Sequence, residues 1–344
     1  MPQDVFVGLD VHKNSIVSVA KAQDGRLVDR SRLSSDDAEL KTYLEGLPGR
    51  KHVVLEAGCV WEHVYDAAAA VSSTVTLAHP HKVRLIAEAS LKSDKVDAGA
   101  LSDLLRLNAV PMAFAPDKPT RDRRQLVRDR LYYKRLATAV KNHVYAVLLR
   151  KGLPYEDGIL GLKRRREDLR KLGLRVVDRG LDMLVAIEGT CKDLDAEVER
   201  AYLTSGEAQL LTTIPGIGKL TALALVAELC PIDRFPNVEK LCSYAGLVPT
   251  VHQSGDTSYH GRLKKKDCNV LLRSLLIEAA WAHRRRAPKS DVSKLGRRVA
   301  RRRGKGKGSV AAARKLLKVV YAVLKRGTPY TPERPGCGGL PAEP

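Results

Sequence analysis

The chain has 344 residues, of which 44% are hydrophobic, and it carries a formal net charge of +21. Its length favours two domains over one, and no run approaches the ~20 apolar residues that a membrane span needs. The first residues, MPQDVFVGLD, lack the charged-then-apolar pattern of a secretory signal, so we expect a cytoplasmic protein with no membrane partner.

The first hundred residues alternate between strand and helix patterns. Strands are expected at 4–10, 15–20, 25–33, 52–58 and 74–79, and helices at 36–47, at 61–71 and in the stretch around residues 94–97. Ser34 or Ser35 is the expected N-cap of the first helix. Three strands followed by alternating helices and strands predict an α/β fold with a ribonuclease-H-like mixed sheet, whose first strand is central.

Four acidic residues stand out within these elements. Asp10 and Glu56 end apolar runs that are expected to be neighbouring strands, whereas Asp94 and Asp97 are three apart and share one helix face. Four carboxylates held together repel each other unless a cation lies among them, and hard oxygen ligands suit Mg²⁺ or Mn²⁺. Such a site would support metal-assisted phosphodiester chemistry. The alternative is structural, because Asp at a strand end often caps a helix.

Two long helices are expected in the middle of the chain. The first covers 118–150 and the second roughly 180–203. The first has one apolar face, with Leu136, Val140, Val144, Val147 and Leu148. The second has a coiled-coil-like seam, with Leu184, Ile187, Cys191, Leu194, Val198 and Ala201. The two helices are expected to pair with each other as a connecting bundle, or to pair with another subunit.

A second domain is expected from about residue 205. LLTTIPGIGKLTALALVAEL contains a helix, a tight glycine turn at 215–218 and a second helix, which is the helix-hairpin-helix pattern. In that pattern the turn amides and the next helix N-terminus face a phosphate, so Gly216, Gly218 and Lys219 are candidate nucleic-acid contacts. The alternative is a plain turn between two helices. The segment after 327 is rich in Pro and Gly and is expected to be disordered.

Most of the positive charge lies near the end of the chain. Residues 261–327 contain 22 Lys or Arg and 3 Asp or Glu, a net charge of 22 − 3 = +19. This surplus indicates phosphate binding, whereas a solvated basic tail or a contact with acidic lipid is the alternative. The candidate nucleic-acid contacts are Arg262, Lys264, Lys265, Lys266, Arg273, Arg301, Arg302 and Arg303. An acidic metal site in a basic protein predicts an enzyme that cuts or joins nucleic acid.

A serine offers a second kind of chemistry. Ser254 is followed by glycine in the polar segment VHQSGDTSYHGRLKKKD, which is expected to be an exposed loop with cations nearby. Those cations could stabilise a pentavalent phosphate, although most Ser-Gly pairs are simply turns. Ser243 is the nearest competitor, but it lies in an apolar, helix-like run.

The six cysteines are scattered and contain no C-x-x-C pair. They are expected to be reduced and mostly buried thiols. Their spacing argues against a zinc site.

Together these motifs resemble those of a known family. The chain resembles the DEDD transposases of the insertion-sequence family numbered one hundred and ten, which are guided by a non-coding RNA. The resemblance spans about residues 4–327. It is carried in order by GLDVHKNS, VVLEAG, SDKVDA, IPGIGKLTA, RFPNVEKLCSYAGLVP, SG at 254–255, and LLRSLLIEAA.

The resemblance implies roles for the candidate residues. Asp10, Glu56, Asp94 and Asp97 look like the metal-binding tetrad, and Ser254 looks like the nucleophile that forms a phosphoserine link to DNA. The implied segments are a RuvC-like domain at 1–117, a helical coiled-coil linker at 118–204, a mostly helical transposase domain at 205–327 and a disordered tail at 328–344.

The family's site pairs one subunit's tetrad with another subunit's serine, which implies a dimer or tetramer. Two features depart from the family pattern. His12 and Lys13 follow Asp10 where the family varies, and Ser258 places a further hydroxyl near Ser254. Ser258 is therefore an alternative nucleophile.

Three functions remain open from the sequence. The first is a transposase that excises and inserts DNA by RNA-guided strand exchange, through a phosphoserine. The second is a metal-only RuvC-like nuclease acting on Holliday junctions, which needs no serine. The third is a non-catalytic nucleic-acid-binding protein, and the ordered set of four acidic residues argues against it.

Overall fold

The computed structural model describes residues 3–90, 98–153, 158–254, 257–263 and 268–332. They belong to two compact units, 1–116 and 117–344. The division into segments ending at 117, 204 and 327 stays a prediction, and most of the expected disordered tail lies outside the described residues. None of the described helices is both long and apolar enough to cross a membrane.

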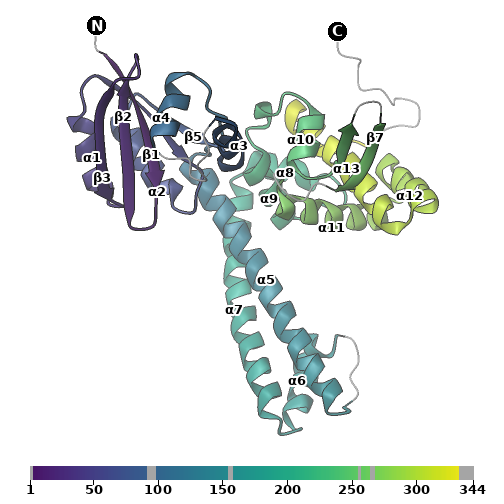
Figure 1. The fold of residues 1–344 in the computed structure, drawn as a ribbon. Helices are drawn as coiled ribbons and strands as arrows, with labels where there is room; N and C mark the ends of the chain where they lie inside the picture. Colours follow the sequence, from purple (N-terminus) through teal and green to yellow (C-terminus); the bar gives the residue numbers. More distant parts are fainter. Residues whose placement is uncertain (1–2, 91–97, 154–157, 255–256, 264–267, 333–344) are drawn as a thin grey trace. The chain divides into compact units, whose positions relative to one another are not determined.

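The N-terminal unit is built around one mixed sheet (Figure 1). Its strands are β1 (Asp4–Val11), β2 (Ser15–Ala22), β3 (Leu27–Ser34), β4 (Arg50–Glu56) and β5 (Thr74–Ala78), in the order β3-β2-β1-β4-β5. β1 is antiparallel to β2 and parallel to β4. The predicted ribonuclease-H-like sheet with a central first strand is therefore confirmed.

Helices cover both faces of this sheet. They are α1 (Asp37–Gly46), α2 (Trp61–Val71), α3 (Pro80–Ser90) and α4 (Ala98–Arg106). Alternation along β4 directs Val53 and Leu55 into the core with α1 and α2, and Val54 into the core with α3 and α4. A side chain at Gly8 would place its Cβ 2.0 Å from the carbonyl oxygen of Ala98. Glycine at this position therefore lets the start of α4 lie directly on β1.

The predicted N-cap of α1 is wrong by one or two residues. Asp36 is the N-cap, and its carboxylate accepts from the backbone N–H groups of Ala38 and Glu39 at 2.9 and 3.0 Å. Ser34 still ends β3, and its hydroxyl donates to the Glu39 side chain. The capping position is thus taken by Asp36, the acid next to the helix. Its negative charge also interacts favourably with the positive, N-terminal end of the helix dipole.

The expectation that the cysteines are mostly buried is also wrong. Of the five in the described segments, all are free thiols, but only Cys242 is buried and Cys59 is exposed. Cys59 lies in the loop between β4 and α2. Loops run over the protein surface, so the burial expected for a cysteine does not apply there.

The C-terminal unit begins with two long paired helices, α5 (Lys118–Arg150) and α7 (Arg175–Leu203) (Figure 1). The short η1 (Ile159–Gly161) and α6 (Lys163–Arg170) lie between them in sequence. Val140 and Val144 pack against Leu181, Leu184 and Ile187. The two predicted apolar faces therefore meet within one chain.

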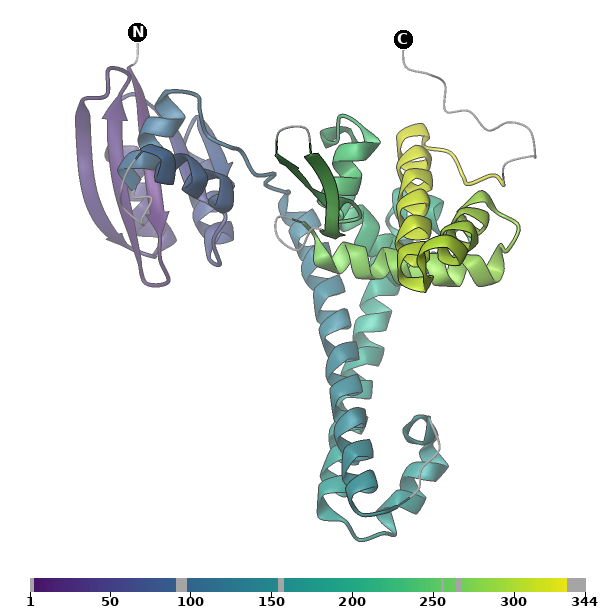
Figure 2. The same ribbon diagram turned by 45° about the vertical axis from the view of Figure 1, so that its right-hand side comes forward.

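The remaining helices form a second core. They are α8 (Gly206–Thr212), α9 (Lys219–Leu229), α10 (Val238–Tyr244), α11 (Val270–Arg286), α12 (Asp291–Arg303) and α13 (Lys305–Arg326), with η2 (Ile232–Arg234) after α9. In Figure 2, α13 (yellow) crosses α11 (light green) with α12 beside them. Residues 222–229 of α9 are all buried, so this helix is the centre of the unit.

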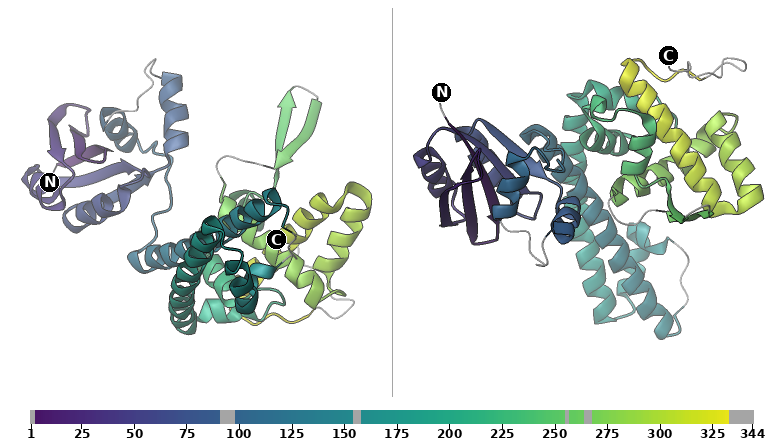
Figure 3. Two further views of the ribbon diagram at one scale, coloured as in Figure 1. Left: turned by 90° about the horizontal axis from the view of Figure 1, so that it is seen from below. Right: turned by 45° about the horizontal axis from the view of Figure 1, so that its top comes forward.

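An antiparallel hairpin interrupts these helices. β6 (Pro249–Ser254) pairs with β7 (Thr257–Leu263), where the sequence had predicted a polar loop. β-branched and aromatic residues, such as Val251 and Tyr259, favour strands even in a polar segment. Figure 3 (left) shows the two strands projecting from the helices of the unit.

Candidate active site and nucleic-acid interface

Asp10 and Glu56 lie side by side where β1 and β4 end. The register of these parallel strands runs up to the pair Leu9 and Leu55, so the acid that follows on each strand projects from the same face of the sheet. Burial, together with repulsion from the Asp10 carboxylate, raises the pKa of Glu56 above its ordinary value. Asp10 also contacts His12, whose Nε2 lies 3.2 Å from its Oδ2. The structure thus brings two of the four predicted carboxylates together.

The other two acids, Asp94 and Asp97, lie outside the part of the chain that the structure describes. The first described residue after them is Ala98, which packs on Gly8 of β1. Gly8 and Asp10 face the same way, because alternate residues of a strand share a face. Among the described residues, no group of three or more His, Cys, Asp or Glu could hold a metal ion. The four-carboxylate site therefore stays a prediction.

The Asp10 and Glu56 pair fits a hard divalent cation. Both donors are carboxylate oxygens, which Mg²⁺ and Mn²⁺ prefer. Both side chains are half-buried, and Glu56 holds its proton more tightly because it is partly desolvated and lies next to a second carboxylate. A bound cation would reverse this effect by favouring the charged form of both acids.

Ser254 is the last residue of β6 and pairs with Thr257 of β7. The alternative nucleophile Ser258 lies on β7 and pairs with Gln253. Ser243 lies in α10, as its apolar surroundings had predicted. The pairing places Ser254 at the end of a strand and not in a free loop, and its role as nucleophile stays a prediction.

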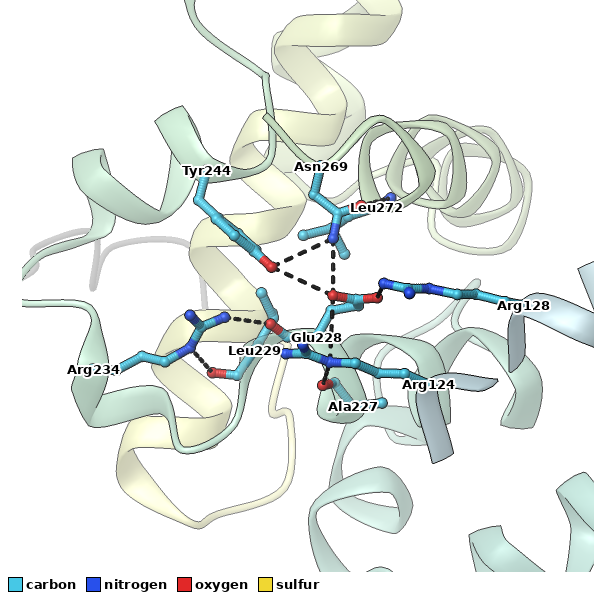
Figure 4. A network of polar contacts seen from close by, with 9 residues as sticks. All are labelled: Arg124, Arg128, Ala227, Glu228, Leu229, Arg234, Tyr244, Asn269 and Leu272. Carbon is cyan, nitrogen blue, oxygen red and sulfur yellow. Dashed lines mark hydrogen bonds and ion pairs between the residues drawn. The ribbon is translucent and has the colours of Figure 1, made fainter. Parts of the chain in front are cut away.

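A buried carboxylate holds the two ends of the segment that carries this hairpin (Figure 4). Glu228 of α9 is 3% exposed, and its Oε2 accepts from the Nδ2 of Asn269 at 2.9 Å and from the hydroxyl of Tyr244 at 3.3 Å. Tyr244 ends α10 and Asn269 is the N-cap of α11. The N–H of Asn269 also donates to the carbonyl of Tyr244 at 2.7 Å. The chain therefore leaves and re-enters the helical core at one anchored point.

Two arginines of α5 compensate the buried charge. Arg128 Nη2 lies 2.9 Å from one oxygen of Glu228, and Arg124 Nε lies 3.6 Å from the other. Arg124 also donates to the carbonyl of Ala227 at 2.7 Å. Burial lowers the pKa of Arg124, and the negative charge of Glu228 acts in the opposite direction. The network thus joins α5 to the segment that carries Ser254.

Replacing Glu228 by alanine should lower the free energy of unfolding of the C-terminal unit by about 3–5 kcal/mol, because Arg124 stays desolvated without its partner. Urea denaturation measures this loss. The control is Glu239→Ala, which breaks ion pairs with Arg314 and Lys318 but removes a side chain that is 53% exposed. Exposed pairs contribute about 1 kcal/mol or less. Equal losses for the two variants would contradict the role given to Glu228.

The glycine turn at 215–218 joins α8 to α9, as the helix-hairpin-helix pattern had predicted. Gly216 has a φ of 95°, and a Cβ there would lie 2.4 Å from the backbone nitrogen of His283. The turn therefore packs on α11 and requires glycine. Gly218 and Lys219 are exposed, and Lys219 forms an ion pair with Glu199. The side of the turn at Gly218 is open to a phosphate, and binding there stays a prediction.

The candidate contacts in the basic region differ in their surroundings. Arg273 is half-buried, and its Nη1 donates to the carbonyl of Gly246 at 3.4 Å, so it supports the fold. The exposed candidates are Arg262 on β7 and Arg301, Arg302 and Arg303 at the end of α12. Lys264, Lys265 and Lys266 lie outside the described residues.

The Glu228 network was not predicted from the sequence. Its signal was present, because Glu228 is the one charged residue in the run LTALALVAELC. A lone carboxylate in an apolar helix indicates a buried, paired charge. Its partners Arg124 and Arg128 could not be identified in this way, since they are about a hundred residues away in the chain.

Two family models match this chain. Residues 7–151 match a model of DEDD-type IS110 enzymes described as "Transposase", and residues 208–294 match one described as "Transposase IS116/IS110/IS902 family". The first match includes Asp10 and Glu56, and the second includes Glu228 and Ser254.

Several curated proteins are similar. The transposase for insertion sequence element IS1111A of Coxiella burnetii is 28% identical over 342 residues, which cover 94% of this chain and 91% of that protein. The transposase for insertion sequence element IS1328 of Yersinia enterocolitica is 25% identical over 346 residues, covering 96% and 100%. The pilin gene-inverting protein of Moraxella bovis is 34% identical over 126 residues, covering 36% and 38%.

Proposed function

The chain belongs to the IS110 family of transposases, enzymes that act on DNA, and we propose that it cuts and rejoins DNA with a carboxylate metal site and a serine nucleophile. The metal ion would be Mg²⁺ or Mn²⁺, held by Asp10, Glu56, Asp94 and Asp97. The nucleophile would be Ser254. The observation that carries the proposal is the pairing of Asp10 with Glu56 at the ends of β1 and β4.

The packing of α4 on β1 supports the proposed metal site. Ala98, which is bonded to Asp97, packs on Gly8, and Gly8 shares a strand face with Asp10. This contact supports a site that adds acids from before α4 to the pair on the strands. When bound, the metal ion would polarise the scissile phosphate and stabilise charge on the attacking and leaving oxygens.

Attack by Ser254 would keep the energy of the broken phosphodiester bond in a covalent phosphoserine link. The Oγ of Ser254 attacks the phosphorus and loses its proton, while the bond from phosphorus to the leaving sugar oxygen breaks and that oxygen gains a proton. A hydroxyl of another strand then attacks the phosphorus and loses its proton, while the bond from phosphorus to Oγ breaks and Ser254 regains a proton. The DNA is thus joined without a nucleotide cofactor. The anchoring of Tyr244 and Asn269 by Glu228 would hold the hairpin for this reaction.

DNA strand exchange fits the similarity to the Moraxella bovis protein better than simple hydrolysis of DNA does. The Moraxella bovis relative is named for inverting a gene, and inversion requires every cut strand to be joined again. A metal-only nuclease would use the carboxylate pair equally well but would release cut ends. The presence or absence of joined product therefore separates the two mechanisms.

Guide RNA and a second subunit complete the proposal. The net charge of +19 over residues 261–327 suits RNA together with DNA. The acids belong to the N-terminal unit and Ser254 to the C-terminal unit. The family resemblance implies that the acids and the serine of one active site come from different subunits. The active particle would then be a dimer or tetramer.

Purified protein, a transcript of the non-coding region beside the gene, and two plasmids that carry the element ends and the target should yield joined plasmid molecules in Mg²⁺. A chelator should abolish the product, and added Mg²⁺ should restore it, because the paired acids need a cation for phosphate chemistry. Sequencing across the junctions measures joining. Cut but unjoined plasmids would replace the proposal with the metal-only nuclease, and joining in the presence of chelator would remove the metal from it.

A further inference from the structure

Beside Trp281 lies a cleft whose side chains combine an exposed aromatic ring with many cations. The cleft has a volume of about 610 Å³, within the range of small-molecule sites, and lies where α11, α12 and α13 meet. Its five cations are Arg284, Arg285, Arg297, Arg301 and Lys305, and none of its lining residues is acidic.

The ring of Trp281 is both exposed and fixed. The residue is 54% exposed, yet its Nε1 donates to the Oγ of Ser309 at 2.8 Å. Ser309 in turn donates to the carbonyl of Lys305 at 3.1 Å. An exposed indole that is locked in one orientation offers a ready surface for stacking, because little rotamer freedom is lost when a ligand covers it.

Close packing of two helices sets the opposite wall. A Cβ on Gly308 of α13 would lie 2.6 Å from both the Cβ of Ala300 and the carbonyl oxygen of Gly296, both on α12. These small residues let α12 lie directly against α13, which brings Arg297 and Arg301 to the same cleft as Trp281. Arg297 is further fixed, since its Nη2 donates to the carbonyl of Pro288 at 2.7 Å.

The charges of the cleft identify the kind of occupant. Within the segments that the structure describes, no ion pair joins Arg284, Arg285, Arg301 or Lys305 to a carboxylate, so an anion of the ligand can compensate them. A second copy of this chain, with a net charge of +21, fits poorly here. Guanidinium groups bind phosphate in a bidentate manner, and an exposed indole stacks on bases.

We propose that this cleft binds an unpaired nucleotide of single-stranded nucleic acid, with the base stacked on Trp281 and the flanking phosphates on the arginines. Duplexes are poor occupants, because their bases are already stacked on each other. The inference rests on the proposed function only in taking nucleic acid as the partner, and it gives that partner a defined point of contact in the C-terminal unit.

The chain allows a direct test, because it contains two tryptophans, Trp61 and Trp281. In a Trp61→Phe protein, fluorescence excited at a wavelength that the 11 tyrosines hardly absorb therefore reports on Trp281 alone. Titration with eight-nucleotide oligouridine or oligothymidine should quench this fluorescence, and an eight-base-pair duplex should not. The tighter of the two single strands identifies which polymer the cleft holds. Absence of quenching by both single strands, or equal quenching by the duplex, would overturn the inference.

Variants separate stacking from general charge. Trp281→Leu should weaken binding of a labelled single strand about tenfold, whereas Trp281→Phe should keep most of the affinity. Arg301→Ala should flatten the salt dependence of single-strand binding by about 0.7 in log-log slope. The matched control is Arg298→Ala, since Arg298 is also exposed on α12 but neither lines the cleft nor belongs to the candidate contacts. Equal effects of the two arginine variants would contradict a defined site.

The binding test and the joining test fail independently. A protein that joins plasmids but shows no quenching of Trp281 would overturn the cleft and leave the proposed function intact. A protein that shows quenching but releases only cut plasmids would keep the cleft and overturn strand exchange.

Discussion

Ser254→Ala protein should lose formation of joined DNA by on the order of a thousandfold or more, because a covalent mechanism has no substitute for its nucleophile. Folding and nucleic-acid binding should stay near those of the wild type, since the substitution removes one hydroxyl at the end of β6. The assay is quantitative amplification across donor–target junctions, alongside thermal unfolding and oligonucleotide binding.

The matched control is Ser258→Ala, which removes a hydroxyl from the partner strand of the same hairpin. It should retain most of the activity. If Ser258→Ala loses activity while Ser254→Ala retains it, Ser258 is the nucleophile. If both variants still cut DNA at the wild-type rate, neither of these two serines is the nucleophile.

Asp10→Asn should reduce strand cleavage by on the order of a thousandfold or more. A bound metal ion supplies several kcal/mol of transition-state stabilisation, and each 1.4 kcal/mol or so corresponds to a factor of ten in rate. The substitution keeps the size of the side chain and removes a charge that, after burial, is the second cause of the raised pKa of Glu56. The N-terminal unit should therefore remain at least as stable, which thermal unfolding can check.

Glu45→Gln is the control for loss of one negative charge. Glu45 is exposed on α1, and α1 packs on the face of the sheet away from Gly8 and Asp10. This variant should cleave normally. Wild-type cleavage by Asp10→Asn protein in Mg²⁺ would rule out a role of this acid in catalysis.

The N-terminal fold could be predicted because its signals are local. Apolar runs alternate with helix patterns, and the acids Asp10 and Glu56 end two such runs, so strand order and strand ends followed from the sequence. The paired helices α5 and α7 were predictable for the same reason, since each carries one apolar stripe. The exact N-cap was not, because Ser34, Ser35 and Asp36 are all good capping residues.

The parts that were missed depend on long-range or weak patterns. The hairpin of β6 and β7 was taken for a loop, since its polar strands carry little of the apolar alternation that marks a half-buried strand. The Glu228 network needs Arg124 and Arg128, which reach it only through tertiary packing. The Trp281 cleft likewise forms only where three helices meet, although its arginines were visible in the sequence as a block of charge.

The most direct test of a phosphoserine transposase is to trap the covalent intermediate. A DNA substrate nicked just beyond the cleavage site lets the cut end diffuse away, so the reaction stalls with protein attached. After denaturation and digestion, mass spectrometry should find the nucleotide adduct on the peptide that contains Ser254, in wild-type protein and not in Ser254→Ala. An adduct on Ser243 or Ser258 would contradict the assignment of the nucleophile, and cleavage with no adduct at all would contradict the mechanism.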